Sequence, residues 1–474
     1  MAQHDYIISN QTFPNTRADI NNVLSAIASN NSGTSAPTTQ YAGQFWIDTT
    51  SSTWTLYIHD GADDIQFATI DTSANTVNFT DSALDVVTDT TPQLGGDLDL
   101  NSNDITGTGD INITGDVTAT NLSGTLPVSN LSGLTNFKNI IINGDMSIAQ
   151  RGTSATGLGN GDTGYHTVDR YRFQEVGAPT FEFTQSQSTD VPSGQGFANS
   201  LKMDCTTAQG SLASGDALNI QQGFEGQNLQ YLKYGTSSAE SLTLSFWVKS
   251  NKTGTYTVEF EETGNTRHFC KTYTIDSAST WEKKTITISG DTVSSLANDN
   301  TLELRPIWWL AAGSNWTSGT LATSGWSSQT TANRVSSSQV NLADNTANEW
   351  FITGVQLEAG TTASDFEFLP YDVNLDRCLR YYEARTTAFS GQRCIWTGDV
   401  TSGNNYFHQT AFSVTKRTEP TVSITVSADS GFDETSIALQ NTYSGKNLIA
   451  ISCTSNATSA RGYFDFEILI DAEL

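Results

Sequence analysis

Hydrophobic and polar residues alternate along most of this chain, a pattern typical of β-strands with one face in a core. The clearest run is SLTLSFWVKS, in which Leu242, Leu244, Phe246 and Val248 occupy every second position. The same alternation predicts strands at residues 180–183, 242–249, 256–260, 285–288, 302–309, 350–357, 406–412, 421–426, 448–453 and 463–470. Because Ser, Thr, Asn and Gly dominate the polar residues, we predict a mainly β protein.

Helical spacing replaces the alternation in two segments. After Pro14, residues 16–29 carry apolar side chains at helical spacing: Ile20, Val23, Leu24 and Ile27. Thr16 and Asp19 form a capping-box pattern at the start of this segment. A helix of about fourteen residues is marginal alone, so its apolar stripe must pack on its own domain, on sister chains or on another protein. A second helix is predicted at residues 371–384.

A small β unit and a repetitive segment precede the central strands. Trp46 and Trp54 lie in short apolar runs that a turn at Asp60 and Gly61 closes. Residues 81–135 then contain short alternating pairs spaced by Gly, Asn and Asp, with no aromatic residue. One chain cannot build a core from them, which leaves disorder or a fibrous assembly of several chains. The quasi-repeat of GDLDLNSNDITGT and GDINITGDVTAT favours assembly.

Charge and composition exclude several classes of function. The 50 acidic and 23 basic residues give a net charge of −27, which argues against nucleic-acid binding because phosphates require clustered Lys and Arg. A chain of 474 residues should divide into three or four domains. The five cysteines have no paired spacing, so neither a disulfide framework nor a zinc site is indicated. No stretch approaches 18 apolar residues, and we expect a protein that is not inserted in a membrane.

No motif predicts catalysis, a cofactor or a metal. The five histidines are isolated, and no nucleophile elbow or phosphate-binding loop is present. An EF-hand is rejected because Ser102 stands where the calcium loop needs Gly. With fifty acids some pair will always be close enough for glycan cleavage, so Glu259, Glu261, Glu262 and Asp365 carry no catalytic weight by themselves.

Two segments that bracket the middle of the chain carry a family resemblance: FKNIIINGDMSIAQRGTS from Phe137, and ITGVQLEAGTTASDFEFLPYDVNLDRCLRYYEA from Ile352. They resemble the opening and closing segments of a carbohydrate-binding-like β-sandwich near the distal end of bacteriophage tail fibres. The residues that carry the resemblance are Asn143, Gly144, Asp145, Met146, Gln150, Arg151, Gly152, Tyr165, Asp169, Arg170, Tyr171, Gln356, Leu357, Glu358, Phe366, Glu367, Cys378, Arg380, Tyr381 and Tyr382.

Other segments agree with this family. TQYAGQFWIDTTSSTWTLYIHDG resembles the N-terminal modules that attach tail fibres to the tail, and FSVTKRTEPTVSI resembles a strand and turn of their tips. The resemblance implies an elongated homotrimer with a short N-terminal helix. Its expected parts are an attachment domain (1–80), an intertwined β shaft (81–137), a jelly-roll-like sandwich (138–371), and a linker helix with a small β tip domain (372–474).

The candidate site residues follow from two kinds of contact. Sugar binding needs exposed aromatic faces beside side chains that bond hydroxyl groups, and residues 305–334 are rich in both. Neighbouring Trp308 and Trp309 must face opposite ways in a strand, so at most one belongs to the core. The candidate receptor or glycan contacts are Trp309, Asn315, Trp316, Trp326, Arg334, Trp396 and Tyr406. For Trp316 and Trp326, which lie in predicted loops, packing over a sheet edge is the alternative. We predict tail attachment through Ile20, Val23, Leu24, Ile27, Trp46 and Trp54.

The expected function is therefore that of a non-enzymatic phage tail fibre, assembled in the bacterial cytoplasm and carried on the virion. Its partners would be a tail adaptor, nozzle or baseplate protein and a host surface glycan or outer-membrane receptor. A polysaccharide-degrading tailspike, a purely structural tail component and a secreted lectin-like adhesin are the alternatives. The missing signal peptide and the shaft repeats disfavour the adhesin.

Overall fold

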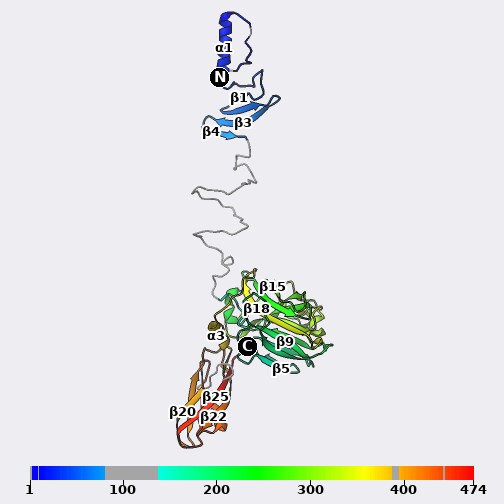
Figure 1. Ribbon diagram of the computed structural model, residues 1–474, viewed down its shortest axis with the longest axis vertical. Helices are drawn as coiled ribbons and strands as arrows, with labels where there is room; N and C mark the ends of the chain where they lie inside the picture. The colour runs from blue at the N-terminus through cyan, green and yellow to red at the C-terminus, as the bar shows by residue number, and fades with distance from the viewer. Residues whose placement is uncertain (1–2, 9, 81–136, 387–393, 441–443) are drawn as a thin grey trace. The chain divides into compact units, whose positions relative to one another are not determined.

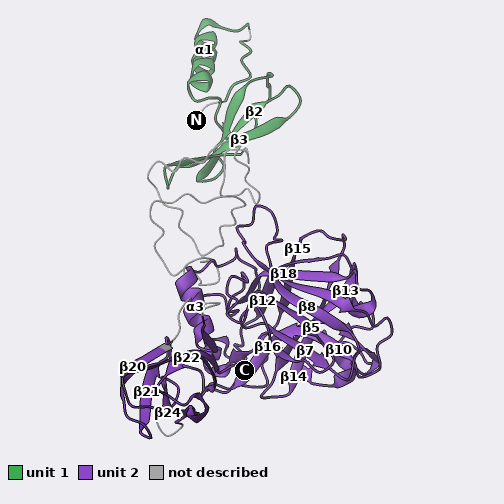
Figure 2. Ribbon diagram, turned by 60° about the horizontal axis from the view of Figure 1, so that its bottom comes forward, with its two compact units in different colours: residues 1–121 green, residues 122–474 purple. Residues whose placement is uncertain are grey.

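The computed structural model describes residues 3–8, 10–80, 137–386, 394–440 and 444–474. The chain divides into two compact units, residues 1–121 and 122–474 (Figures 1 and 2). Both consist chiefly of antiparallel β-sheets, which confirms the mainly β prediction. The predicted shaft, residues 81–137, lies outside the described residues except for Phe137. None of the described helices is long and apolar enough to cross a membrane.

The N-terminal unit contains one helix, α1 (Phe13–Ala28). It begins three residues earlier than predicted, because Pro14 occupies the first turn, where its missing N–H costs nothing. The predicted capping box is absent, since the hydroxyl of Thr16 donates to backbone carbonyls of the preceding turn and Asp19 bonds His4 and Gln11. Within the described part of this unit, the helix buries only Ala26.

A four-stranded sheet completes the N-terminal unit. Its strands are β1 (Phe45–Asp48), β2 (Thr53–His59), β3 (Asp64–Asp71) and β4 (Thr76–Phe79), joined in sequence order. On one face, Trp46 is buried and stacks on Tyr57 at 4.8 Å between ring centroids. On the other, Phe67 contacts Phe45 and Phe79 at 5.8 and 5.7 Å, and all three rings are exposed.

Residues 138–371 form two antiparallel sheets packed face to face (Figure 2). The larger runs β17-β14-β13-β16-β10-β7-β6, with β11 beside β16. Its strands are β6 (Gly164–Tyr165), β7 (Arg172–Val176), β10 (Ala217–Gln221), β11 (Phe224–Glu225), β13 (Gly254–Glu262), β14 (Arg267–Ile275), β16 (Leu302–Ala312) and β17 (Ser327–Ser328). The other sheet runs β15-β12-β18-β9-β8-β5 and comprises β5 (Ser154–Leu158), β8 (Glu182–Ser188), β9 (Ser200–Thr207), β12 (Leu242–Ser250), β15 (Glu282–Ile288) and β18 (Glu349–Ala359).

The core lies between these two sheets and confirms the alternation. The predicted inward residues of β12, from Leu242 to Val248, are all buried in it. Phe246 contacts Trp308 of the facing sheet, with ring centroids 6.0 Å apart. Trp309 points the opposite way, as the pleat requires, yet it is also buried. Another segment of the chain must therefore cover the outer face of the larger sheet.

The last ninety residues form two smaller sheets around a second core that includes Phe432, Phe464 and Phe466. One sheet runs β19-β25-β20, with β22 also paired to β25, and the other runs β21-β24-β23. Their strands are β19 (Tyr382–Arg385), β20 (Cys394–Val400), β21 (Asn405–Ala411), β22 (Thr421–Ser430), β23 (Ala438–Leu439), β24 (Leu448–Thr454) and β25 (Ser459–Asp471).

The helix that joins the sandwich to these sheets, α3 (Tyr371–Leu379), is shorter than predicted. Residues 382–384 belong to β19 instead, where Tyr382 pairs with Asp471 of β25. The strand partner comes from the far end of the chain, so local helical spacing gave no sign of it.

Candidate functional site

The two segments that carry the family resemblance meet in space, although some two hundred residues separate them. The backbone N–H of Ile140 donates to the carbonyl of Leu357 at 2.8 Å, and Val355 donates to Gly144 at 2.9 Å. A Cβ at Gly144 would lie 2.1 Å from the carbonyl oxygen of Val355, so only glycine fits this crossing. These contacts join the first segment of the sandwich to its last segment.

Asn143 organises the first segment from a left-handed backbone conformation with φ +60°. Its buried side chain donates to the carbonyls of Ile148 and Asp169 at 2.9 and 3.1 Å and accepts from the N–H of Ile148 at 3.0 Å. Asp169 in turn accepts from the N–H of Gln150 at 2.9 Å, while burial raises the pKa of its carboxyl to about 6. These contacts fix the loop that faces α3.

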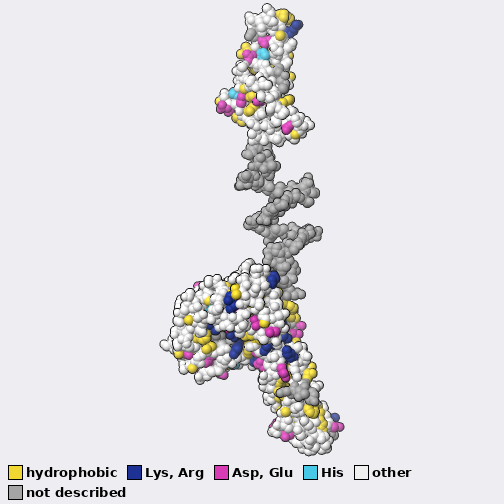
Figure 3. Space-filling model, turned by 180° about the vertical axis from the view of Figure 1, so that it is seen from behind, with side chains coloured by type: hydrophobic (Ala, Val, Ile, Leu, Met, Phe, Trp, Pro, Cys, Tyr) yellow, Lys and Arg dark blue, Asp and Glu magenta, His cyan; other side chains and the backbone are white. Residues whose placement is uncertain are grey.

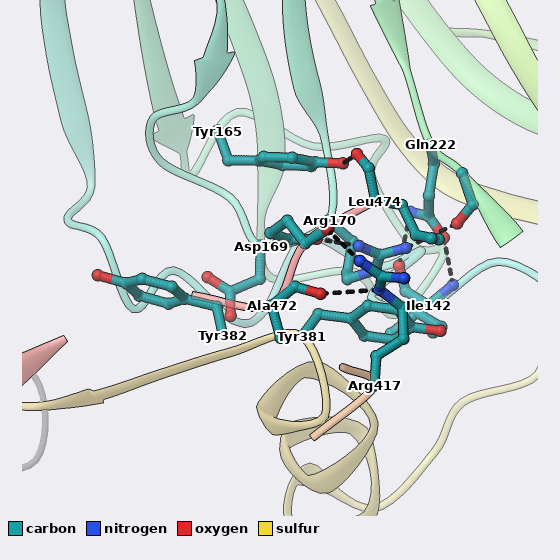
Figure 4. A network of polar contacts seen from close by, with 12 residues as sticks. Ile142, Tyr165, Asp169, Arg170, Gln222, Tyr381, Tyr382, Arg417, Ala472 and Leu474 are labelled. Carbon is teal, nitrogen blue, oxygen red and sulfur yellow. Dashed lines mark hydrogen bonds and ion pairs between the residues drawn. The ribbon is translucent and has the colours of Figure 1, made fainter. Parts of the chain in front are cut away.

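A polar network joins the sandwich to the C-terminal sheets (Figure 4). The guanidinium of Arg170 stacks 3.5 Å from the ring centre of Tyr381 and pairs with Glu473. Glu225 accepts two hydrogen bonds from Arg380 at 2.7 Å each and one from the hydroxyl of Tyr381 at 2.7 Å. Burial alone would raise the pKa of Glu225, but these donors lower it, so the group stays ionised.

The ends of the C-terminal sheets enter the same network. Tyr165 donates from its hydroxyl to the carbonyl of Leu474 at 3.0 Å, and Arg417 donates to the carbonyl of Ala472 at 2.9 Å (Figure 4). Figure 3 shows Lys and Arg side chains on the side of the sandwich that adjoins these sheets. Many of the residues that carry the resemblance thus hold this junction together.

The predicted glycan contacts in the tryptophan-rich loop, residues 313–340, have a different setting. This loop lies over the outer face of the larger sheet, where Trp309, Trp316 and Val335 share a small apolar cluster with Ala217 and Ile307. The rings of Trp309 and Trp316 are 5.2 Å apart between centroids. Trp309 is buried, whereas Trp316 keeps part of its ring accessible and Asn315 is exposed.

Arg334 fastens this loop to the sheet. Its Nε donates to both carboxylate oxygens of Glu259, at 2.8 and 2.9 Å, and another nitrogen reaches Glu261 at 3.2 Å. The indole N–H of Trp309 donates to the same Glu259 at 3.1 Å. Glu259 is fully buried, so Arg334 balances a charge that would otherwise be costly.

Glu259, His268 and Cys270 place three potential metal-ligand atoms within 4.8 Å of one another. His268 lies 3.0 Å from Glu259 through Nδ1, and burial raises the pKa of the Cys270 thiol. However, the guanidinium of Arg334 already engages both oxygens of Glu259, and its positive charge opposes a cation there. We interpret the group as a buried ion-pair network.

The other predicted aromatic contacts also take part in packing. The indole N–H of Trp326 donates to the carbonyl of Ser289 at 2.8 Å, and its ring contacts Tyr234 and Phe269. In the C-terminal sheets, Trp396 and Tyr406 both pack on Phe432, with ring centroids 5.0 and 5.8 Å away. All three side chains remain partly accessible.

Of the two acids next to Glu259, Glu261 forms an ion pair and Glu262 has a raised pKa. Glu261 pairs with Arg305 at 2.7 Å. Glu262 is fully buried and accepts a hydrogen bond from Asn265 at 3.2 Å. Burial, reinforced by the nearby charge of Asp291, raises the pKa of Glu262 to about 8. Glu262 is therefore a carboxyl that stays protonated at neutral pH.

The predicted attachment residues of α1 lie on the surface of the N-terminal unit. Leu24 and Ile27 are each 57% exposed, Ile20 is 41% exposed, and Val23 is half-buried. Of the two predicted tryptophans in the sheet, Trp46 is buried and Trp54 is half-buried. The helix stripe and the phenylalanine face of the sheet are therefore both open to a partner.

A cavity that sequence reasoning missed lies beside α3. It has a volume of about 330 Å³, and its lining includes Phe137, Asn228, Tyr231, Arg377 and Tyr381. Tyr231 and Phe137 are 49% and 55% exposed. The only sequence signal was the pair of arginines one helical turn apart, Arg377 and Arg380, but nothing local indicated which of them has a carboxylate partner.

No family model and no curated protein matches this chain. Similar solved structures include the enzymatically active domain of bacteriophage CBA120 tailspike protein 4, at 12% identity and a TM-score of 0.26. That match covers 47% of this chain and 22% of the tailspike. A putative sugar binding protein from Bacteroides thetaiotaomicron matches at 13% identity and a TM-score of 0.24, covering 47% of this chain and 99% of that one. TmCBM61, solved with β-1,4-galactotriose, matches at 9% and 0.22, covering 47% and 98%. At these TM-scores the similarities do not indicate a function for this chain.

Proposed function

We propose that this protein is a bacteriophage tail fibre, a structural component of the virion that recognises the host cell. Its N-terminal unit attaches to a tail adaptor, nozzle or baseplate protein, and its sandwich and C-terminal sheets contact a surface glycan or outer-membrane receptor. Three chains assemble into one fibre. Recognition, and not catalysis, is its work.

One observation carries this proposal: the tail-fibre-like segments from Phe137 and from Ile352 interlock through backbone hydrogen bonds and together close the sandwich. The bonds between Ile140 and Leu357 and between Gly144 and Val355 are part of this contact. The segments therefore belong to one structural module, whose order along the chain agrees with the resemblance.

The surface of the N-terminal unit supports the attachment role. The chain has a net charge of −27 and therefore enough polar residues to cover its surface. Nevertheless, α1 and the sheet expose Leu24, Ile27 and Phe67. Contiguous exposed apolar side chains mark surfaces that another protein covers. A tail protein and the sister chains are the partners that the proposal supplies.

Binding without cleavage is supported by the states of the candidate acids. Glu259 and Glu261 are engaged by Arg334 and Arg305, and Glu262 is buried away from solvent. Weak contacts from three chains, repeated over several fibres, add up through effective concentration, so each site needs only modest affinity.

Binding of the fluorescently labelled full-length protein to cells of candidate hosts tests this function. Free surface polysaccharide serves as competitor, and its length is measured after incubation. We expect saturable binding that the polysaccharide competes away without being shortened. Shortened polysaccharide would replace the proposal with a depolymerising tailspike. Binding to tail proteins but to no host cell would replace it with a purely structural role.

A further inference from the structure

We propose that the cavity beside α3 binds one carboxylate-bearing sugar residue, of the hexuronic or sialic acid class, in the receptor glycan. The source of the ligand rests on the proposed function. The volume of about 330 Å³ is at the lower end for small-molecule sites. It suits a single sugar ring.

The cavity contains an arginine, Arg377, that forms no ion pair with a described carboxylate. Within the described ranges, no carboxylate oxygen lies within 4.0 Å of Arg377, which donates to the backbone carbonyl of Asn139 at 3.1 Å. The acid in its electrostatic surroundings, Glu367, accepts from the N–H groups of Lys138 and Asn139, at 3.2 and 2.8 Å. Burial lowers the pKa of Arg377, which reflects the cost of holding this charge. A ligand carboxylate would supply the missing counter-charge.

The neighbouring arginine is not available for this purpose. Arg380 places two of its nitrogens 2.7 Å from the two oxygens of Glu225, so its charge is compensated inside the protein. Among the described residues that line the cavity, Arg377 is therefore the arginine without a carboxylate partner, in a chain with a large acidic surplus. This local reversal of charge favours an anionic ligand.

Aromatic side chains supply the second half of the recognition. Phe137 lies with its ring centre 5.9 Å from the guanidinium carbon of Arg377, and Tyr231 lines the same cavity. Both rings are about half exposed, so each offers a face to the apolar side of a sugar. The exposed amide of Asn228 can bond hydroxyl groups. A bare anion such as acetate would use the charge but not the rings.

Calorimetric titration of the full-length protein with sodium glucuronate, galacturonate and N-acetylneuraminate tests the site, with glucose and acetate as reference ligands. We expect at least one acid sugar to bind at millimolar concentration and both reference ligands to bind more weakly. Arg377→Gln should weaken binding roughly ten- to hundredfold, because it removes a charge-assisted contact. Tyr231→Ala should weaken it as well, whereas Tyr371→Ala, an exposed aromatic outside the cavity lining, should leave it unchanged.

Melting temperatures of the variants separate loss of binding from misfolding, and the surface substitution Tyr231→Ala serves if Arg377→Gln fails to fold. The proposal is overturned if no acid sugar binds, if acetate binds equally well, or if neither variant alters the affinity. Host-cell adsorption that persists in these variants would overturn the cavity while leaving the fibre function intact. Sugar binding without adsorption to any host would overturn the fibre function while leaving the cavity proposal intact.

Discussion

At the scale of single residues, one buried polar side chain, that of Asn143, orders the loop that faces α3. Asn143 combines a left-handed backbone with three hydrogen bonds to the loop around it. Asparagine tolerates this conformation better than most residues, and its amide both donates and accepts. No apolar residue of similar size could hold the loop in this way.

Asn143→Ala should lower the free energy of unfolding by about 2–4 kcal/mol, because it leaves buried backbone groups without partners. Asn160 provides a matched control, since it also has positive φ, at 54°, but lies exposed in a loop. Asn160→Ala should cost less than about 1 kcal/mol. Chemical denaturation of both variants gives the comparison, and equal losses would refute the role assigned to Asn143.

Glu262 gives the protein a specific pH dependence. Its pKa of about 8 in the folded protein lies above the usual 4.5 of the carboxyl, so the folded state holds a proton that the unfolded state has released between these values. Stability from this group is complete below about pH 4.5 and is lost as the pH rises through 8. The melting temperature of Glu262→Gln should therefore rise relative to that of the wild type as the pH increases from 5 to 9. A constant difference across this range would contradict the assignment.

At the scale of elements, the loop over residues 313–340 changes the character of a sheet face. Without it, the outer side of β16 would expose Trp309 and Ile307. With it, those side chains are buried and Arg334 compensates Glu259. The tryptophans that composition marks as binding residues therefore also contribute to stability.

Arg334→Met should destabilise the sandwich by about 3–5 kcal/mol, because it leaves the charge of Glu259 buried without a partner. Lys233→Met is the control, since Lys233 and Glu240 form an exposed pair at 2.7 Å whose loss should cost at most about 1 kcal/mol. Denaturant titration followed by tryptophan fluorescence measures both variants. Similar small effects would mean that Arg334 does not hold the loop.

At the scale of the whole molecule, α1 of the N-terminal unit exposes an apolar stripe that includes Ile20, Leu24 and Ile27, and the repeats that follow this unit favour assembly. The trimer proposal therefore predicts that light scattering on the intact protein gives three times the 51.1 kDa of one chain. Removal of residues 1–136, which leaves residues 137–474, tests whether the N-terminal part is needed for this mass. A monomeric mass for the intact protein would refute both the trimer and the shaft.

The sequence alone determined the β class, the positions of part of the strands, and the common face of Leu242, Leu244, Phe246 and Val248 in β12. These depend on a period of two residues, which any local stretch displays. The opposite directions of Trp308 and Trp309 follow from the same period. The tertiary structure alone decided that Trp309 is nevertheless buried and that α3 ends at Leu379. It also decided that Arg380 has a carboxylate partner, Glu225, whereas Arg377 has none among the described residues. Each of these outcomes depends on residues distant in the sequence, whose approach no local pattern records.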